Sequence, residues 1–266
     1  MKPYRSTPAA AGLAGLLLGL ALTTSWSAGE VRELASGLTA LPSMDELDPM
    51  PVLPRTRLVV AMEEARSSLE RHRPWRAWQE LEAHVADPAE APATAVLLAA
   101  RAASEWGGWR EVRELLAGRD WLGRAEGGEG WFLLGRAYEE AERMEAAADA
   151  YRRYTAIPGA RSRAVAYARL GNVLRGEGRH REAAAAFGAA AEQTPGARDW
   201  LRTLQAEALA RAGSPEVVSV AAASAGVSGP VRVRQARAEA SFWTASGDTV
   251  RALDRLDREV RGLVSL

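Results

Sequence analysis

Apolar and small residues recur along most of the chain with the spacing that places them on one face of an α-helix. This helical pattern begins near Arg57 and continues toward Leu266. Between Ser36 and Arg55 the periodicity is lost, and four prolines interrupt the chain there: Pro42, Pro49, Pro51 and Pro54. The pattern therefore predicts an extended, proline-rich leader over residues 28–56 and an all-α region over residues 57–266.

A longer period is superimposed on the helical one in the middle of the chain. One unit carries Trp131, Leu134, Gly135, Tyr138, Ala147, Tyr151 and Pro158. The next unit repeats the arrangement with Tyr167, Leu170, Gly171, Leu174, Ala183, Phe187 and Pro195. Small residues at matching places allow two helices to approach closely, while the larger residues around them fill the space between helix pairs. The period predicts tandem helical hairpins.

This pattern resembles the tetratricopeptide repeat family, whose unit reads W-x-x-L-G-x-x-Y, then A-x-x-x-F, then P. The resemblance extends over residues 57–266 and implies a right-handed α-solenoid of about six hairpins. Their expected ranges are about 58–91, 93–126, 128–162, 164–197, 199–231 and 233–266. In this family the first helix of each hairpin lines the concave face, and its second, fifth, ninth, twelfth and thirteenth places typically meet a ligand.

Extending the register in both directions predicts one turn inside each hairpin, at His72, Gly107, Glu142, Gly178, Gly213 and Gly247. The eighth place then holds Ala65, Ala100, Gly135, Gly171, Ala206 and Ala240. The twentieth place holds Ala77, Val112, Ala147, Ala183, Val218 and Ala252, and the twenty-fourth holds Leu81, Leu116, Tyr151, Phe187, Ala222 and Leu256. Arg202, Ala236 and Glu239 depart from the pattern, because large apolar residues are usual at their places.

The N-terminus has the order of a Sec-type signal peptide, predicted over residues 1–27. Lys2 and Arg5 precede an apolar stretch, Ala9–Leu22, and a small-residue Ser-Trp-Ser pattern follows before Ala28. The stretch is shorter than the roughly 20 residues of a membrane-spanning helix, so cleavage is favoured over a retained anchor. The chain has no cysteine, which excludes a lipoprotein. We expect a periplasmic or secreted protein with no stable membrane span after cleavage.

Composition excludes several classes of function. The chain has 34 basic and 34 acidic residues, hence no net charge, and no basic excess typical of nucleic-acid binding. With no cysteine and only His72, His84 and His180 as imidazoles, far apart in sequence, neither a metal site nor a cofactor is expected. A nucleophile elbow and a P-loop are both missing, and adjacent carboxylates on a helix point in different directions. The sequence therefore predicts a protein that is not an enzyme.

Basic side chains recur at the ninth place, where the family's ligands bind. Arg66, Arg101 and Arg136 are 35 residues apart and would form a ladder along the concave groove, followed by Asn172. Apolar residues occupy the fifth place beside them: Met62, Leu97 and Phe132. We expect these seven residues to contact a peptide or protein partner, and the guanidinium groups favour an acidic one.

The arginine ladder has an alternative interpretation as solvated helix surface. Each arginine is followed four residues later by a carboxylate, at Glu70, Glu105 and Glu140. Intrahelical ion pairs at this spacing are worth only about 0.3 kcal/mol each. The family's carboxylate clamp is not reproduced, because Ala168 replaces the basic residue expected at the fifth place, so binding of a chaperone-type C-terminal peptide is not implied.

Two functions fit these features. The first is an extracytoplasmic scaffold that binds a peptide or protein in its concave groove, in cell-envelope assembly or secretion. The alternative is the superhelical, non-catalytic portion of a soluble lytic murein transglycosylase, to which the architecture is similar, with peptidoglycan as partner and the catalytic domain absent from this chain. Several tryptophans also suggest a sugar-stacking groove, but most fall at helix starts or turns, which favours packing between hairpins.

Overall fold

The computed structural model describes residues 56–223 and 229–264, and within these ranges it is all-α. The helices are α3 (Arg57–Glu70), α4 (Pro74–Glu82), α5 (Ala93–Trp106), α6 (Trp109–Leu116), α7 (Glu129–Glu140), α8 (Met144–Thr155), α9 (Arg163–Gly176), α10 (His180–Gln193), α11 (Arg198–Arg211), α12 (Glu216–Ala222), α13 (Gly229–Ala245) and α14 (Thr249–Val264). A short 3₁₀ segment, Pro195–Ala197, precedes α11. A turn at Ala125–Gly128 precedes α7, and Glu126, Gly127 and Gly128 have positive φ there.

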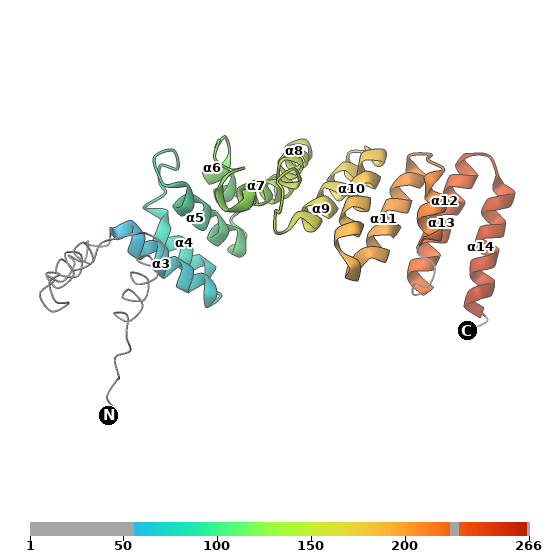
Figure 1. The fold of residues 1–266 in the computed structure, drawn as a ribbon, viewed down its shortest axis with the longest axis horizontal. Coiled ribbons are helices and arrows are strands. Elements are labelled where there is room, and N and C mark those ends of the chain that lie inside the picture. The colour runs from blue at the N-terminus through green and yellow to red at the C-terminus, as the bar shows by residue number, and fades with distance from the viewer. Residues whose placement is uncertain (1–55, 224–228, 265–266) are drawn as a thin grey trace, which may run out of the picture. The chain divides into compact units, whose positions relative to one another are not determined.

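Consecutive helices pair into six hairpins, hairpin 1 being α3–α4 and hairpin 6 being α13–α14 (Figure 1). Each helix packs against the next one along the chain, and some first helices also contact each other directly, such as α3 with α5 and α11 with α13. The expected all-α solenoid of helical hairpins is thus confirmed. The proposed signal peptide and nearly all of the proline-rich leader lie outside the described residues.

The turn inside every hairpin has the same backbone geometry. The six turn residues expected from the register all have positive φ: His72, Gly107, Glu142, Gly178, Gly213 and Gly247. The residue after each turn donates its backbone N–H to the carbonyl oxygen five residues earlier, as Arg73 does to Ser68 at 2.9 Å and Arg179 to Leu174 at 2.9 Å. This hydrogen bond defines a Schellman helix end, which requires a left-handed residue at the turn.

The core lies between the two helices of each hairpin and between neighbouring hairpins. All six eighth-place residues are buried, and so are five of the six expected at the twentieth place. Hairpin 5 differs: Val218 is 36% exposed, and Val217 is buried in its stead. The first turn of α12 is tighter than in the other second helices, because Val217 and Val218 donate to Ser214 and Pro215, three residues back. The expected register is therefore wrong by one residue in α12.

None of the helices in the described residues combines the length and apolar character needed to cross a bilayer.

Candidate functional site

Arg101 joins two hairpins. From α5 it donates two hydrogen bonds to the Glu129 carboxylate at the start of α7, one of them from Nε to Oε1 at 2.7 Å. Glu126 adds a weaker contact at 3.7 Å. Hydrogen bonding to Glu129 raises the pKa of Arg101 above its usual value. The guanidinium thus links hairpin 2 to hairpin 3. The intrahelical ion pair between Arg101 and Glu105, considered above, does not form.

Arg136 is also engaged by its own chain. Its guanidinium lies 4.8 Å from the centre of the Trp109 ring, a cation–π contact between hairpins 2 and 3. On α7 it is 3.5 Å from Glu140 and 3.9 Å from Glu139. The expected pair with Glu140 is therefore present. Only a quarter of the side chain is exposed, so Arg136 offers little surface to a partner.

The third member of the ladder, Arg66, is exposed on α3. It forms no ion pair with any residue of the described ranges, and its expected partner Glu70 does not bind it. The three arginines therefore differ in kind, because one is solvated and two hold neighbouring hairpins together. They do not form a uniform cationic strip.

The other predicted contact residues divide in the same way. Met62 is half-buried and Asn172 is exposed, with its side-chain oxygen accepting a hydrogen bond from Arg175 at 3.0 Å. Leu97 is only 1% exposed and belongs to the core. Phe132 packs against the rings of Tyr151 and Tyr154, at 6.0 and 5.5 Å between centroids. Leu97 is thus unable to contact a partner, because the fifth place of hairpin 2 is covered by the adjoining helices.

A second contact between hairpins repeats the Arg101–Glu129 geometry with the charges exchanged. Glu207, at the ninth place of hairpin 5, accepts two hydrogen bonds of 2.8 Å from Arg234, at the second place of hairpin 6. The Arg234 guanidinium also lies 4.4 Å from the Trp200 ring centre. The ninth place of one hairpin therefore faces the second place of the next, which locates the surface that the first helices share.

The surface formed by the first helices contains a cavity in hairpins 4 to 6. A cavity of about 510 Å³ is lined by residues of α9, α11 and α13: Arg175, Glu207, Arg211, Arg234, Arg237, Ala238 and Ser241. All but Ala238 stand at the second, fifth, ninth, twelfth or thirteenth places. The sequence register thus locates the groove correctly, although the ladder residues of hairpins 1 to 3 do not line this cavity.

The cavity carries an excess of positive charge. Arg234 is neutralised by Glu207, and Arg175 donates to the neutral Asn172 side chain. Arg211 and Arg237 are exposed and have no carboxylate partner among the described residues. We call Arg175, Arg211 and Arg237 the groove arginines. They stand at the twelfth, thirteenth and fifth places, so they do not recur at one place of the repeat and the sequence period does not predict them.

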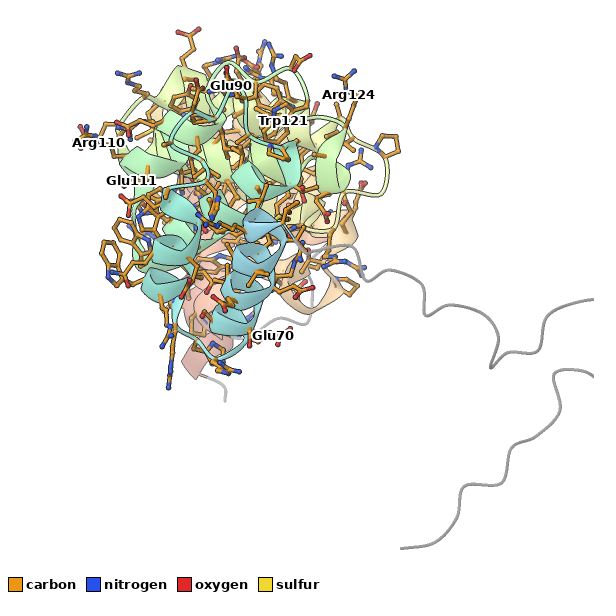
Figure 2. All side chains as sticks on the ribbon, turned by 90° about the vertical axis from the view of Figure 1, so that its left-hand side faces the viewer. Glu70, Glu90, Arg110, Glu111, Trp121 and Arg124 are labelled. Carbon is orange, nitrogen blue, oxygen red and sulfur yellow. The ribbon has the colours of Figure 1, made fainter. Side chains whose placement is uncertain are left out.

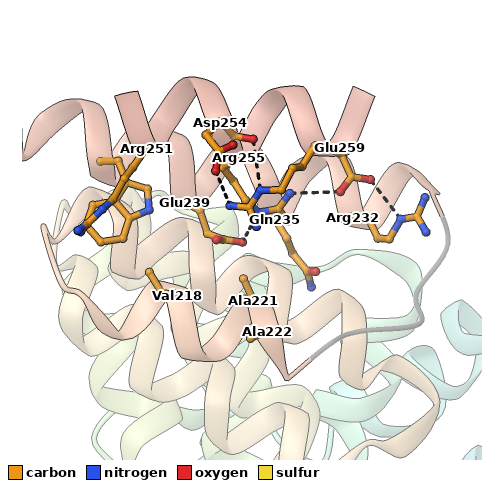
Figure 3. Close-up of a pocket in the computed structure, with 12 residues that line it drawn as sticks. Val218, Ala221, Ala222, Arg232, Gln235, Glu239, Arg251, Asp254, Arg255 and Glu259 are labelled. Carbon is orange, nitrogen blue, oxygen red and sulfur yellow. Dashed lines mark hydrogen bonds and ion pairs between the residues drawn. The ribbon is translucent and has the colours of Figure 1, made fainter. Parts of the chain in front are cut away.

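A second cleft, of about 540 Å³, lies among α12, α13 and α14 (Figure 3). Its arginines are matched by carboxylates. Arg255 binds Glu239 at 3.0 Å and Glu259 at 3.3 Å, and Arg232 binds Glu259 at 3.1 Å. Side-chain exposures of 11% and 12% for the two glutamates indicate a partly buried network that holds α14 on α13. Its charge is internally satisfied, so it is a weaker candidate for binding.

A third polar network fixes hairpin 3 against hairpin 4. The Tyr151 hydroxyl donates to Glu139, which also accepts from Arg169 of α9 at 3.1 Å. Burial raises the pKa of Tyr151 above its usual value, and the hydrogen bond to Glu139 adds to the shift. No grouping of three His, Asp or Glu side chains suited to a metal ion occurs in the described residues.

Comparison with known proteins gives one family match, within hairpin 3. Residues 128–159 match the family model of the tetratricopeptide repeat, the segment where the sequence pattern is most complete. Among solved structures, the crystal structure of BtubC (BKLC) from P. vanneervenii is similar at 17% identity and a TM-score of 0.42, over 79% of this chain and 90% of that one. No significant match to a curated protein was found. The chain is therefore an all-α array of helical hairpins, and its third hairpin matches a tetratricopeptide repeat.

Proposed function

We propose that the protein is an extracytoplasmic scaffold that binds an acidic segment of a protein partner in the groove formed by the first helices of hairpins 4 to 6. The observation that carries the proposal is the set of groove arginines, two of which have no carboxylate partner in the described ranges. Tetratricopeptide repeats typically bind proteins or peptides, and hydrogen bonds from guanidinium to carboxylate are among the stronger polar contacts. The groove arginines therefore replace the ladder as the expected contact surface.

The three side chains come from three successive first helices, Arg175 from α9, Arg211 from α11 and Arg237 from α13. An extended peptide running across these helices would meet one cation from each. The Arg234–Glu207 pair lies within the same cavity and is already satisfied. It would shape the groove without competing for the carboxylates of the peptide.

The extracytoplasmic location and a role in cell-envelope assembly or secretion rest on the N-terminal sequence alone. Lys2, Arg5 and the apolar stretch Ala9–Leu22 support export, with a mature protein beginning near Ala28. N-terminal sequencing of exported material tests this part, and a mature protein that still begins at Met1 contradicts it. The transglycosylase alternative, with peptidoglycan as partner, also rests on the sequence and stays a prediction.

The binding proposal is tested with a synthetic peptide of Glu and Asp residues, titrated calorimetrically into the protein at low and moderate salt. The triple variant Arg175→Gln, Arg211→Gln, Arg237→Gln should bind at least about tenfold more weakly, because each charge-assisted contact contributes about 1.5 to 3 kcal/mol. Salt should weaken binding to the unaltered protein more than to the variant.

A matched control removes three arginines elsewhere: Arg76, Arg124 and Arg261. Their side chains are 63%, 76% and 78% exposed, and each pairs with a carboxylate of its own turn. Changing them to Gln alters the net charge equally, yet it should leave peptide affinity nearly unchanged. Equal loss in both variants would mean that the peptide responds to overall charge, and the groove would then have no special role.

A further inference from the structure

Tryptophans and arginines are paired repeatedly in this chain. Four indole rings each have an arginine guanidinium within 5 Å of the ring centre: Trp109 with Arg136 at 4.8 Å, Trp131 with Arg153 at 4.8 Å, Trp200 with Arg234 at 4.4 Å, and Trp243 with Arg251 at 4.9 Å. Stacking of a planar guanidinium on an indole face combines cation–π attraction with van der Waals contact. Arginine on tryptophan is thus a recurrent contact of this fold.

A cluster of three further tryptophans has no such cation. Trp75 and Trp106 lie 5.0 Å apart between ring centres and are nearly perpendicular, at 86°. Trp78 lies 6.4 Å from Trp106 at 64°. No guanidinium of the described residues stacks on any of the three rings. Trp75 is 52% exposed, so an aromatic face of the cluster is open to solvent.

The local sequence explains why these rings meet. Trp75, Trp78 and Glu82 are three and four residues apart on α4, which places them on one face of that helix. Trp106 is the last residue of α5, and its ring folds back over Gly108. A Cβ atom at Gly108 would lie 2.3 Å from Cζ2 of that ring, so the ring position depends on glycine at this turn.

The three rings border a cavity of about 530 Å³ between the second helices α4 and α6. Its polar lining is mainly acidic and comprises Glu82, Glu111, Glu114 and Arg110. Arg110 and Glu114 bind each other at 2.8 Å, and Arg110 also interacts with the charge of Glu111 without a close ion pair. Glu82 has no ion-pair partner in the described ranges. Arg110 and Glu111 project together from one edge of the molecule (Figure 2). We call this cavity the tryptophan pocket.

We propose that the tryptophan pocket binds an arginine side chain of a partner polypeptide. The open indole faces supply the stacking surface, and the carboxylates of Glu82 and Glu111 supply the complementary charge. Arginine fits better than lysine, because its flat guanidinium stacks on a ring and forks toward a carboxylate at the same time. The pocket lies at hairpins 1 and 2, so it is separate from the groove arginines of hairpins 4 to 6 and takes the opposite charge.

The test uses three short peptides that differ at one residue: arginine, its neutral isostere citrulline, or lysine. Binding is followed through the indole ¹⁵N–¹H resonances of the full-length protein, each assigned by substitution of its tryptophan. The arginine peptide should shift the Trp75 and Trp106 resonances most, and the lysine peptide should shift them less. Equal shifts from the citrulline peptide, or from a neutral oligosaccharide, would overturn the proposal.

Two variants locate the contact. Trp75→Ala and Glu111→Gln should each weaken the binding of the arginine peptide by about three- to tenfold. A cation stacked at a partly exposed site changes the affinity by about tenfold or less. Trp200→Ala is the matched control, because Trp200 is similarly exposed, at 48%, but lies in hairpin 5. Thermal melting of each variant separates lost binding from lost folding. Unchanged affinity in both folded pocket variants would contradict the proposal.

A third variant removes Arg110, the one arginine among the described residues that lines the tryptophan pocket. Arg110→Gln frees Glu114 from its ion pair and removes a positive charge next to the site. Affinity for the arginine peptide should then rise, or at least not fall. A fall would show that the pocket recognises an anion, contrary to the proposal.

Discussion

Gly171 lies directly against the aromatic ring of Phe187, so closely that a Cβ atom on Gly171 would come within 2.6 Å of the ring carbon Cε1. The two residues stand at the eighth and twenty-fourth places of hairpin 4. Gly135 and Tyr151 have the same relation in hairpin 3, at 2.7 Å. A fully buried ring of the second helix thus occupies the space that a side chain of the first helix would otherwise fill.

Replacing Gly171 with alanine should therefore destabilise the protein despite the better helix propensity of alanine. We expect the free energy of unfolding to fall by about 1 to 3 kcal/mol through overpacking. Urea denaturation measures this change. Gly176→Ala on the same helix is the control, because nothing lies within 4 Å of the position that its new Cβ would take, and this substitution should not destabilise. Similar losses at both positions would show that ring contact is not the cause.

Replacing Glu142 with glycine should stabilise the protein. Its φ of 55° places an L-residue in the left-handed region, which glycine occupies without steric cost. Glu142→Gly should raise the free energy of unfolding by about 1 kcal/mol, seen as a higher melting temperature. Glu142→Ala keeps a Cβ and should give no comparable gain. A higher melting temperature for the alanine variant than for the glycine variant would contradict this explanation.

The Arg101–Glu129 contact should tolerate exchange of its charges. Arg101→Glu alone places two carboxylates together and should cost about 1 kcal/mol or more at this partly exposed site. Adding Glu129→Arg should recover most of that loss, because Glu207 and Arg234 use the reversed arrangement at the equivalent places. A double-mutant cycle in urea gives the coupling energy. Additive losses would indicate that the two side chains do not interact.

Tyr151 should make the fold sensitive to alkali. Its pKa is raised in the folded protein, so the folded state holds the proton more tightly than the unfolded state. The stabilisation is complete below the unfolded pKa of about 10 and is lost as the pH rises above it. Thermal melting between about pH 9 and 11.5 should show a steeper fall for the unaltered protein than for Tyr151→Phe. Parallel curves would mean that Tyr151 is not the responsible group.

The sequence predicts most of the fold because its determinants are local and repeated. All six turn residues have the positive φ that the register predicts, since each helix end is encoded by a residue able to adopt positive φ and by the spacing of small residues around it. The exception is α12, where Ser214 and Pro215 tighten the first turn and rotate the buried face by one residue. A hydrophobic pattern does not reveal such a change in hydrogen bonding.

The candidate site was less predictable because charge pairing is not local. The period shows that Arg66, Arg101 and Arg136 occupy equivalent places, but it does not show which of them meets a carboxylate from another hairpin. Glu129 lies 28 residues beyond Arg101 in the sequence, and Trp109 reaches Arg136 from the preceding hairpin. The groove arginines stand at three different places of the repeat, and therefore produce no visible period.

The Arg101–Glu129 and Glu207–Arg234 pairs, which join the ninth place of one hairpin to the second place of the next, also restrict the order of the hairpins. If hairpin 6 directly followed hairpin 2, Arg101 would face Arg234. If hairpin 3 followed hairpin 5, Glu207 would face Glu129. Both contacts would bring like charges together, whereas the native order of the hairpins brings opposite charges together. The hairpins are therefore not interchangeable modules, and a protein with shuffled hairpins should be less stable even where the packing between the two helices of each hairpin is kept.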